Sequence, residues 1–188
     1  MKITNTENNY GIVTILLHWL LAILIVGLFV LGVYMVDLDY YDSWYNAAPW
    51  LHKSVGIGVF FLSLIRIAWA LGNQRPMPLP THKQWEIIAA RITHILFYVL
   101  LIIICISGYF ITTTKGASID MFGLFNIPAV TRLNENQAVI SGEIHEIAAY
   151  VMAFLFLLHV CATFKHHYVD KDVTFIRILK QIKQKENK

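Results

Sequence analysis

Four long apolar runs dominate the pattern of hydrophobic and polar positions, at about residues 11–36, 50–71, 87–112 and 144–164. Each run is long enough for a helix that crosses a bilayer, which takes about 20 residues at a rise of about 1.5 Å per residue. None of them alternates apolar and polar residues with a period of two, as strands of a membrane barrel do. The pattern therefore predicts an all-α integral membrane four-helix bundle that forms a single domain over residues 1–188.

The connections between the runs predict how the bundle is oriented. The first run is too long and too weakly basic at its front for a cleaved signal peptide, so we expect it to stay in the protein. Residues 37–49 carry acidic but no basic side chains, whereas residues 72–83 and the tail after residue 164 carry lysine and arginine. Because basic connections stay inside, both termini and the middle connection are expected to be cytoplasmic. The sequence therefore predicts a multi-pass protein of the bacterial cytoplasmic (inner) membrane.

Two segments outside the runs have patterns of their own. In the connection at 115–142, the apolar stretch 121–125 either packs on the outer face of the bundle or lies in the lipid interface. In the tail, residues 173–183 place apolar side chains at helical spacing, with Arg177 and Lys180 opposite them. This spacing predicts an amphipathic helix that lies on anionic lipid.

Composition narrows the class of protein further. The chain has 188 residues, of which 57% are hydrophobic and 14% charged, and its mean hydropathy is +0.57. Such a chain is too apolar for a soluble enzyme, and its formal charge of +3 does not indicate a surface that binds nucleic acid. Cys105 and Cys161 form neither a metal-binding pair nor a covalent haem attachment, so a haem would be bound without a covalent link. The eight histidines stand out, because several lie inside the apolar runs.

The histidines fall at two depths. His145 and His159 are fourteen residues apart on one helix, which places them on the same face and about 21 Å apart along the axis. His52 is expected level with His145 near the outer side, and His18 level with His159 near the inner side. His94 also lies at the inner level, where it is either a functional residue or a hydrogen-bonding partner of a neighbouring helix.

The fourteen-residue spacing recurs on the other helices, from His18 to Gly32, from His52 to Arg66 and from His94 to Gly108. Glycine makes room for a bulky group, and Gly56 adds space beside His52. Two flat groups, each held by two imidazoles, explain this layout, and haem is such a group. The sequence predicts axial ligand pairs His52 with His145 and His18 with His159, and predicts that Arg66 holds a haem propionate.

The segments around these residues resemble the bacterial cytochrome b561 family of four-helix dihaem proteins. They occur in the family's order over nearly the whole chain: LLHWLLA at His18, LHKSVGIGVF at His52, LSLIRIAW at Arg66, RITHILFYVLL at His94, EIHE at His145, LLH at His159, and KHHYVDKD at 165–172. The resemblance implies two b haems on His18, His52, His145 and His159, and electron transfer to or from a membrane quinone such as ubiquinone. In one branch it also implies oxidation of superoxide at the outer face.

Several alternatives stay open at this stage. His166 and His167 are candidates for proton delivery at a quinone edge, or they anchor the helix end among lipid headgroups. His82 is interpreted as an ordinary loop residue. Superoxide is an anion, and few basic residues are expected on the outer side: Lys53, Lys115 and Arg132. A cytochrome subunit of a larger membrane dehydrogenase or hydrogenase has a similar ligand plan, and a transporter of divalent metals or small molecules is the alternative from another class. The electron donor and the oligomeric state are not determined by the sequence.

Overall fold

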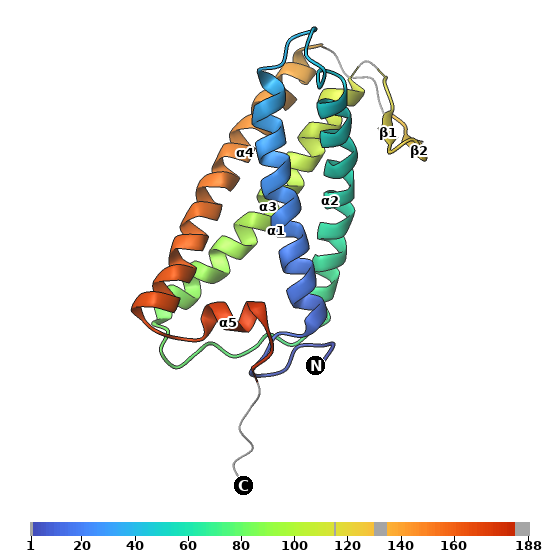
Figure 1. Ribbon diagram of the computed structural model, residues 1–188. Helices are drawn as coiled ribbons and strands as arrows, with labels where there is room; N and C mark the ends of the chain where they lie inside the picture. Colours follow the sequence, from blue (N-terminus) through green and yellow to red (C-terminus); the bar gives the residue numbers. More distant parts are fainter. Residues whose placement is uncertain (1, 115, 130–134, 183–188) are drawn as a thin grey trace.

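The computed structural model describes residues 2–114, 116–129 and 135–182. Four helices lie side by side along one axis (Figure 1): α1 (Ile12–Val36), α2 (Ala47–Leu71), α3 (Gln84–Thr113) and α4 (Glu135–Phe164). All four are long and apolar enough to cross a membrane. The prediction of an integral membrane four-helix bundle is confirmed.

Three of the helices begin earlier than their apolar runs predict. α2 begins at Ala47 instead of residue 50, α3 at Gln84 instead of residue 87, and α4 at Glu135 instead of residue 144. At α3 and α4 the added residues include polar side chains, so hydropathy alone does not detect them. The connection between α3 and α4 is correspondingly shorter than the predicted 115–142 segment.

The bundle consists of two closely packed helix pairs. α1 packs on α2 and α3 packs on α4, whereas neither α1 nor α2 packs closely on α4. The buried apolar side chains that join the pairs form one cluster, which contains Leu21, Val59, Leu101 and Met152. Many large apolar side chains elsewhere on the four helices point outward and are exposed, among them Ile23, Phe61, Ile103 and Leu157. This inverted distribution suits a surrounding lipid phase.

A small β-hairpin lies beside α2 near one end of the bundle, which we call the hairpin end. β1 (Ile119–Met121) pairs antiparallel with β2 (Phe125–Ile127), and the turn between them contains Gly123 at a φ of 72°. β1 packs on α2 with Ile119 and Met121 buried, while Phe125 stays exposed. The stretch 121–125 was expected either to pack on the bundle or to lie in the lipid interface. Its first residue, Met121, packs on the bundle.

Polar contacts fix the hairpin to the start of α2. The Trp50 indole donates a hydrogen bond of 2.7 Å to Asp120 Oδ1, and the buried Ser54 hydroxyl donates one of 2.9 Å to the Asp120 carbonyl. The hydrogen bond from Trp50 and then that from the Gly123 N–H hold the pKa of the Asp120 carboxyl below its usual value, and outweigh the opposing effect of burial. Asp120 thus acts as an ionised acceptor that joins the hairpin to α2.

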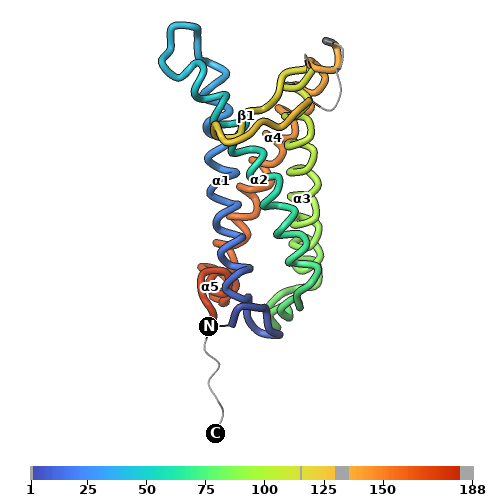
Figure 2. Tube along the Cα trace, turned by 90° about the vertical axis from the view of Figure 1, so that its right-hand side faces the viewer, coloured from blue at the N-terminus to red at the C-terminus, as the bar shows by residue number. Residues whose placement is uncertain are grey.

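The other end of the bundle, which we call the terminal end, brings together three segments that are distant in the sequence (Figures 1 and 2). These are residues 2–11, residues 72–83, and the chain after α4, which forms the π-helical turn η1 (Lys165–Val169) and the short helix α5 (Thr174–Leu179). Met77 N–H donates to the Glu7 carbonyl, and Asn9 Nδ2 donates to the Ile182 carbonyl. The chain's first residues and its tail therefore lie at the same end, as expected.

The tail helix differs from its prediction in two respects. It spans Thr174–Leu179 instead of residues 173–183, of which Lys183 lies outside the described residues. Arg177 is buried rather than part of an exposed polar face, because its guanidinium donates to the Met77 carbonyl at 3.0 Å and lies over the Tyr10 ring. The interpretation of Arg177 as part of the exposed polar face was wrong: its side chain ties α5 to the 72–83 connection and the N-terminal segment.

Candidate functional site

At the hairpin end, α2 and α4 direct two imidazoles toward each other. The ring centroids of His52 and His145 are 6.2 Å apart, with an angle of 65° between the ring planes. His145 Nδ1 lies 2.8 Å from the Ile104 carbonyl, which can only accept, so Nδ1 carries the proton and the Nε2 lone pair is free. A hydrogen bond of this kind fixes the tautomer and the ring orientation of a metal-ligating histidine.

At the terminal end, α1 and α4 bring together His18 and His159, whose ring centroids are 6.5 Å apart. His94 lies beside them, with its centroid 5.6 Å from that of His159. Arg66 reaches the same place: its Nη2 is 3.3 Å from His18 Nδ1, and its Nε donates to the Tyr98 hydroxyl at 3.0 Å. The terminal-end group thus contains three imidazoles and a guanidinium.

The separations within both pairs match those of two ligands on opposite sides of one metal ion. A metal–imidazole bond of about 2.0 Å on each side, plus the distance from each nitrogen to its ring centre, places the centroids about 6.3 Å apart. The measured values are 6.2 Å for His52 and His145 and 6.5 Å for His18 and His159. Both pairs therefore fit bis-imidazole ligation of a haem iron.

Two buried polar atoms support the same interpretation, because neither has a hydrogen-bond partner among the described residues. They are Arg66 Nη1 and His52 Nδ1. Unsatisfied buried donors are costly, and their presence points to a missing partner. A guanidinium with one free nitrogen beside a histidine pair suits the carboxylate of a haem propionate.

Two of the glycines found by the fourteen-residue spacing lie directly against the hairpin-end imidazoles. A Cβ on Gly108 would come within 3.0 Å of His145 Cε1, and a Cβ on Gly32 within 3.2 Å of His52 Cε1. At Gly56 an added Cβ would meet nothing within 4 Å, so the space beside His52 is open in the protein alone. Gly32 of α1 thus leaves space for the His52 ring of α2, and Gly108 of α3 leaves space for the His145 ring of α4.

The apolar cluster lies midway between the two histidine levels. Val59 is seven residues from both His52 and Arg66, and Met152 is seven residues from both His145 and His159. Leu101 occupies the same position between His94 and Gly108. The best-packed part of the interior therefore separates two regions that are lined by imidazoles.

The predicted quinone-edge residues have different surroundings. His166, on η1, is mostly buried, and its Nδ1 lies 2.9 Å from Asp170 Oδ2 and 3.2 Å from Asp172 Oδ2. The His167 ring packs against Tyr168 and Phe175 instead. His166 therefore has acidic partners, whereas His167 is held among aromatic rings.

One residue beside His166 was not predicted to be functional. His82, which the sequence suggested was an ordinary loop residue, lies 3.2 Å from Asp172 Oδ2, and its ring centroid is 4.6 Å from that of His166. Sequence spacing could not reveal this contact, since His82 and Asp172 are ninety residues apart and meet only when the tail folds back. Of the basic residues expected at the outer side, Lys115 and Arg132 lie outside the described residues, and Lys53 is on α2.

Comparisons with known proteins agree with this geometry. Residues 9–181 match the model of the family described as prokaryotic cytochrome b561. The chain is 42% identical to cytochrome b561 homolog 2 of Escherichia coli (strain K12), over 95% of both chains. It is 30% identical to cytochrome b561 homolog 1 of the same organism, over 68% of this chain and 72% of that one. It is also 28% identical to a protein of Yersinia pestis named probable superoxide oxidase CybB, over 92% and 97%.

Proposed function

Because the chain belongs to the prokaryotic cytochrome b561 family, whose members bind b-type haem and carry electrons in membranes, we propose that it transfers electrons across the bacterial inner membrane through two haems. The electrons pass between a donor at the hairpin end, taken as the outer side, and ubiquinone at the terminal end. His52 and His145 bind one haem, and His18 and His159 bind the other. Haem with both axial positions filled supplies one-electron transfer rather than oxygen binding.

The observation that carries this proposal is the separation of the rings in the two histidine pairs, 6.2 and 6.5 Å. A divalent-metal transporter gives no reason for two such pairs, since zinc sites gather three or four ligands around one ion. The side chains around each pair have supporting roles. The Ile104 carbonyl orients His145, Gly32 and Gly108 leave space, and Arg66 holds a propionate with the nitrogen that lacks a partner.

Reduction of a quinone also needs protons, and the residues of η1 suit their delivery. His166 lies at the terminal end, seven residues after His159, with its ring beside the carboxylates of Asp170 and Asp172. An imidazole can both accept and donate a proton, and a neighbouring carboxylate orients it. His166 is therefore the proton donor to the reduced quinone, and His167, which packs on Phe175, contributes to the wall of the site.

Superoxide is one candidate for the donor, because a relative is named as a probable superoxide oxidase. Superoxide and a reduced quinol should each be offered to the purified protein in a quinone-linked assay. Rapid haem reduction by superoxide, abolished by superoxide dismutase, supports it as the donor. Haem reduction by quinol alone would reverse the direction of flow that we propose.

The haem assignment has a direct optical test. The purified protein should give a reduced-minus-oxidised spectrum of b type and bind two haems per chain. His145→Ala should lose the hairpin-end haem and keep the other, whereas His82→Ala, which changes a histidine outside both levels, should keep both. Retention of two haems by the His145 variant, or a protein without visible absorption, contradicts the proposal.

A further inference from the structure

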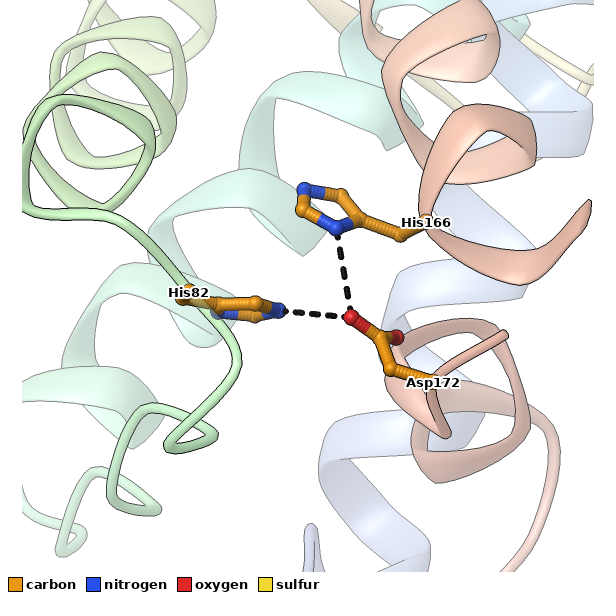
Figure 3. A group of neighbouring side chains, drawn as sticks. All are labelled: His82, His166 and Asp172. Atoms are coloured by element: carbon orange, nitrogen blue, oxygen red, sulfur yellow. Dashed lines mark ion pairs between the residues drawn. The ribbon is translucent and has the colours of Figure 1, made fainter. Parts of the chain in front are cut away.

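A second group of potential metal ligands lies at the terminal end, apart from both histidine pairs. It consists of His82 from the 72–83 connection, His166 from η1, and Asp172 from the turn before α5 (Figure 3). The ligand atoms His82 Nε2, His166 Nδ1 and Asp172 Oδ2 all lie within 4.8 Å of one another. Two imidazole nitrogens and one carboxylate oxygen form a donor set that suits divalent transition metals, whereas magnesium and calcium prefer oxygen.

The two oxygen–nitrogen spacings in this group agree with tetrahedral coordination. Ligands about 2.0–2.1 Å from a zinc ion at tetrahedral angles are about 3.3 Å from one another. Asp172 Oδ2 lies 3.2 Å from His82 Nε2 and 3.2 Å from His166 Nδ1. Asp170 Oδ2, at 2.9 Å from His166 Nδ1, is placed on the edge of the same group.

The two oxygens of Asp172 have separate roles. Oδ1 accepts a hydrogen bond of 2.8 Å from the Thr174 N–H, which fixes the carboxylate in the turn before α5. Oδ2 faces the two imidazoles and accepts a long contact of 3.4 Å from the Thr81 hydroxyl. The carboxylate is therefore fixed with one oxygen turned toward the two imidazoles.

The charge balance around the group leaves this carboxylate without a fixed cation. Lys165 pairs with Glu86 at 2.6 Å and with Asp170 at 2.7 Å, so its single positive charge is shared between those two carboxylates. The ion pairs of Asp172 among the described residues are only with His82 and His166, and these carry charge only when protonated. His166 Nδ1 makes no hydrogen bond of good geometry in the described part of the chain, despite its two close oxygens. His82 Nε2 has one competing neighbour, the Thr174 hydroxyl at 2.9 Å.

We propose that His82, His166 and Asp172 form a binding site for a divalent transition metal ion such as Zn²⁺, which links the 72–83 connection to η1 and the tail. With neutral imidazoles the empty site has one negative charge, and an ion of charge +2 replaces the protons that otherwise bridge the rings and the carboxylate. The bound ion also occupies His166 Nδ1. If the proposed function is correct, the metal therefore removes His166 from proton delivery and inhibits quinone reduction.

The binding test does not depend on turnover. The haem-loaded, tag-free full-length protein is dialysed against Zn²⁺ buffered at micromolar free concentration, and bound zinc is counted by mass spectrometry separately from haem iron. We expect one zinc per chain for the wild type and for the matched control Glu7→Gln, which lies at the same end. His82→Gln and Asp172→Asn should bind at least tenfold less at the same free zinc, with haem spectra unchanged.

X-ray absorption at the zinc edge tests the ligands in the wild type itself, so the proposal does not depend on the variants folding. Two imidazole ligands with nitrogen–zinc distances of about 2.0 Å are expected. A zinc shell without imidazole scattering, equal zinc in the wild type and both variants, or no zinc bound at micromolar concentration would overturn the site. If zinc binds as expected but does not slow quinone reduction, the site stands and the proton-delivery role of His166 is refuted.

Discussion

Gly108 on α3 lies directly against the His145 ring, so that a Cβ at this position would come within 3.0 Å of His145 Cε1 and 3.1 Å of Nδ1. The ring cannot easily move away, because its Nδ1–H donates a hydrogen bond of 2.8 Å to the carbonyl of Ile104, which also lies on α3. Gly108 and the proposed haem ligand His145 therefore depend on each other, because α3 both makes space for the imidazole and fixes its orientation.

The first prediction is that Gly108→Ala displaces His145 and weakens haem binding at the hairpin end. Alanine is a better helix former than glycine, so the variant should fold. We expect the haem content to fall from two toward one per chain, as measured by the pyridine haemochrome assay. Gly27→Ala on α1, where an added Cβ meets nothing within 4 Å, is the matched control and should keep two haems. A Gly108 variant with full haem content shows that the contact does not constrain the ligand.

The second prediction concerns Arg66, whose positive charge lies beside His18 and not beside His145. A nearby cation favours the reduced haem, which has one more negative charge than the oxidised form. Arg66→Gln should therefore lower the midpoint potential of the terminal-end haem, by an amount on the order of tens of millivolts. Redox titration followed by optical spectra measures this, with Lys180→Gln at the exposed end of α5 as control. A shift in the midpoint potential of the hairpin-end haem instead would contradict the assignment of Arg66 to the terminal-end haem.

The third prediction separates His166 from His167. General acid catalysis contributes roughly 10²–10⁴ in rate, so His166→Gln should slow quinone reduction by at least about tenfold while haem spectra stay normal. His167→Gln should have a smaller effect, because its ring packs on Tyr168 and Phe175 and makes no ion pair with a carboxylate in the described part of the chain. The rates are compared under single-turnover conditions with pre-reduced protein and a soluble ubiquinone analogue. Equal effects of the two substitutions would remove the distinction that the ion pairs suggest.

The fourth prediction is a pH dependence at the hairpin end. The pKa of Asp120 is lower in the folded protein than its usual value of 3.8, so its contribution to stability is fully present above pH 3.8. This contribution is lost as the pH falls through the lowered pKa. Hydrogen exchange of the β1–β2 amides, corrected for the intrinsic rates, should therefore accelerate below about pH 4. In Trp50→Phe, which lacks the 2.7 Å indole hydrogen bond, the amides should exchange faster at neutral pH and depend less on acid.

Helix number and the depth of the histidines could be predicted from the sequence, because both follow from local periodicity. Apolar length gives the spans, and fourteen steps of about 100° give a shared helix face. Contacts that depend on how distant segments fold back could not be predicted in this way. The burial of Arg177, which bonds to the Met77 carbonyl, and the meeting of His82 with Asp172 are both of this kind.

The helices α2, α3 and α4 also extend upstream of the predicted spans, for a different reason. Hydropathy detects the part of a helix that lies in hydrocarbon, whereas the helix itself continues until its backbone groups find other partners. At α3 the Glu86 carboxylate accepts from the Lys83 N–H, and the Glu86 N–H donates to the Lys83 carbonyl, so the helix begins in polar sequence. Recognition of Glu86 as a capping residue would have moved the predicted start of α3 upstream.

The apolar cluster of Leu21, Val59, Leu101 and Met152 has a consequence for the energetics of the membrane. Between the two histidine levels the packed interior offers no chain of titratable groups, since the only one among the described residues of the cluster and its neighbours is the Cys105 thiol. An electron that crosses this layer travels without a proton. The proposed reaction therefore separates charge, and its driving force should change with membrane potential by up to about 2.3 kcal/mol per 100 mV for each electron.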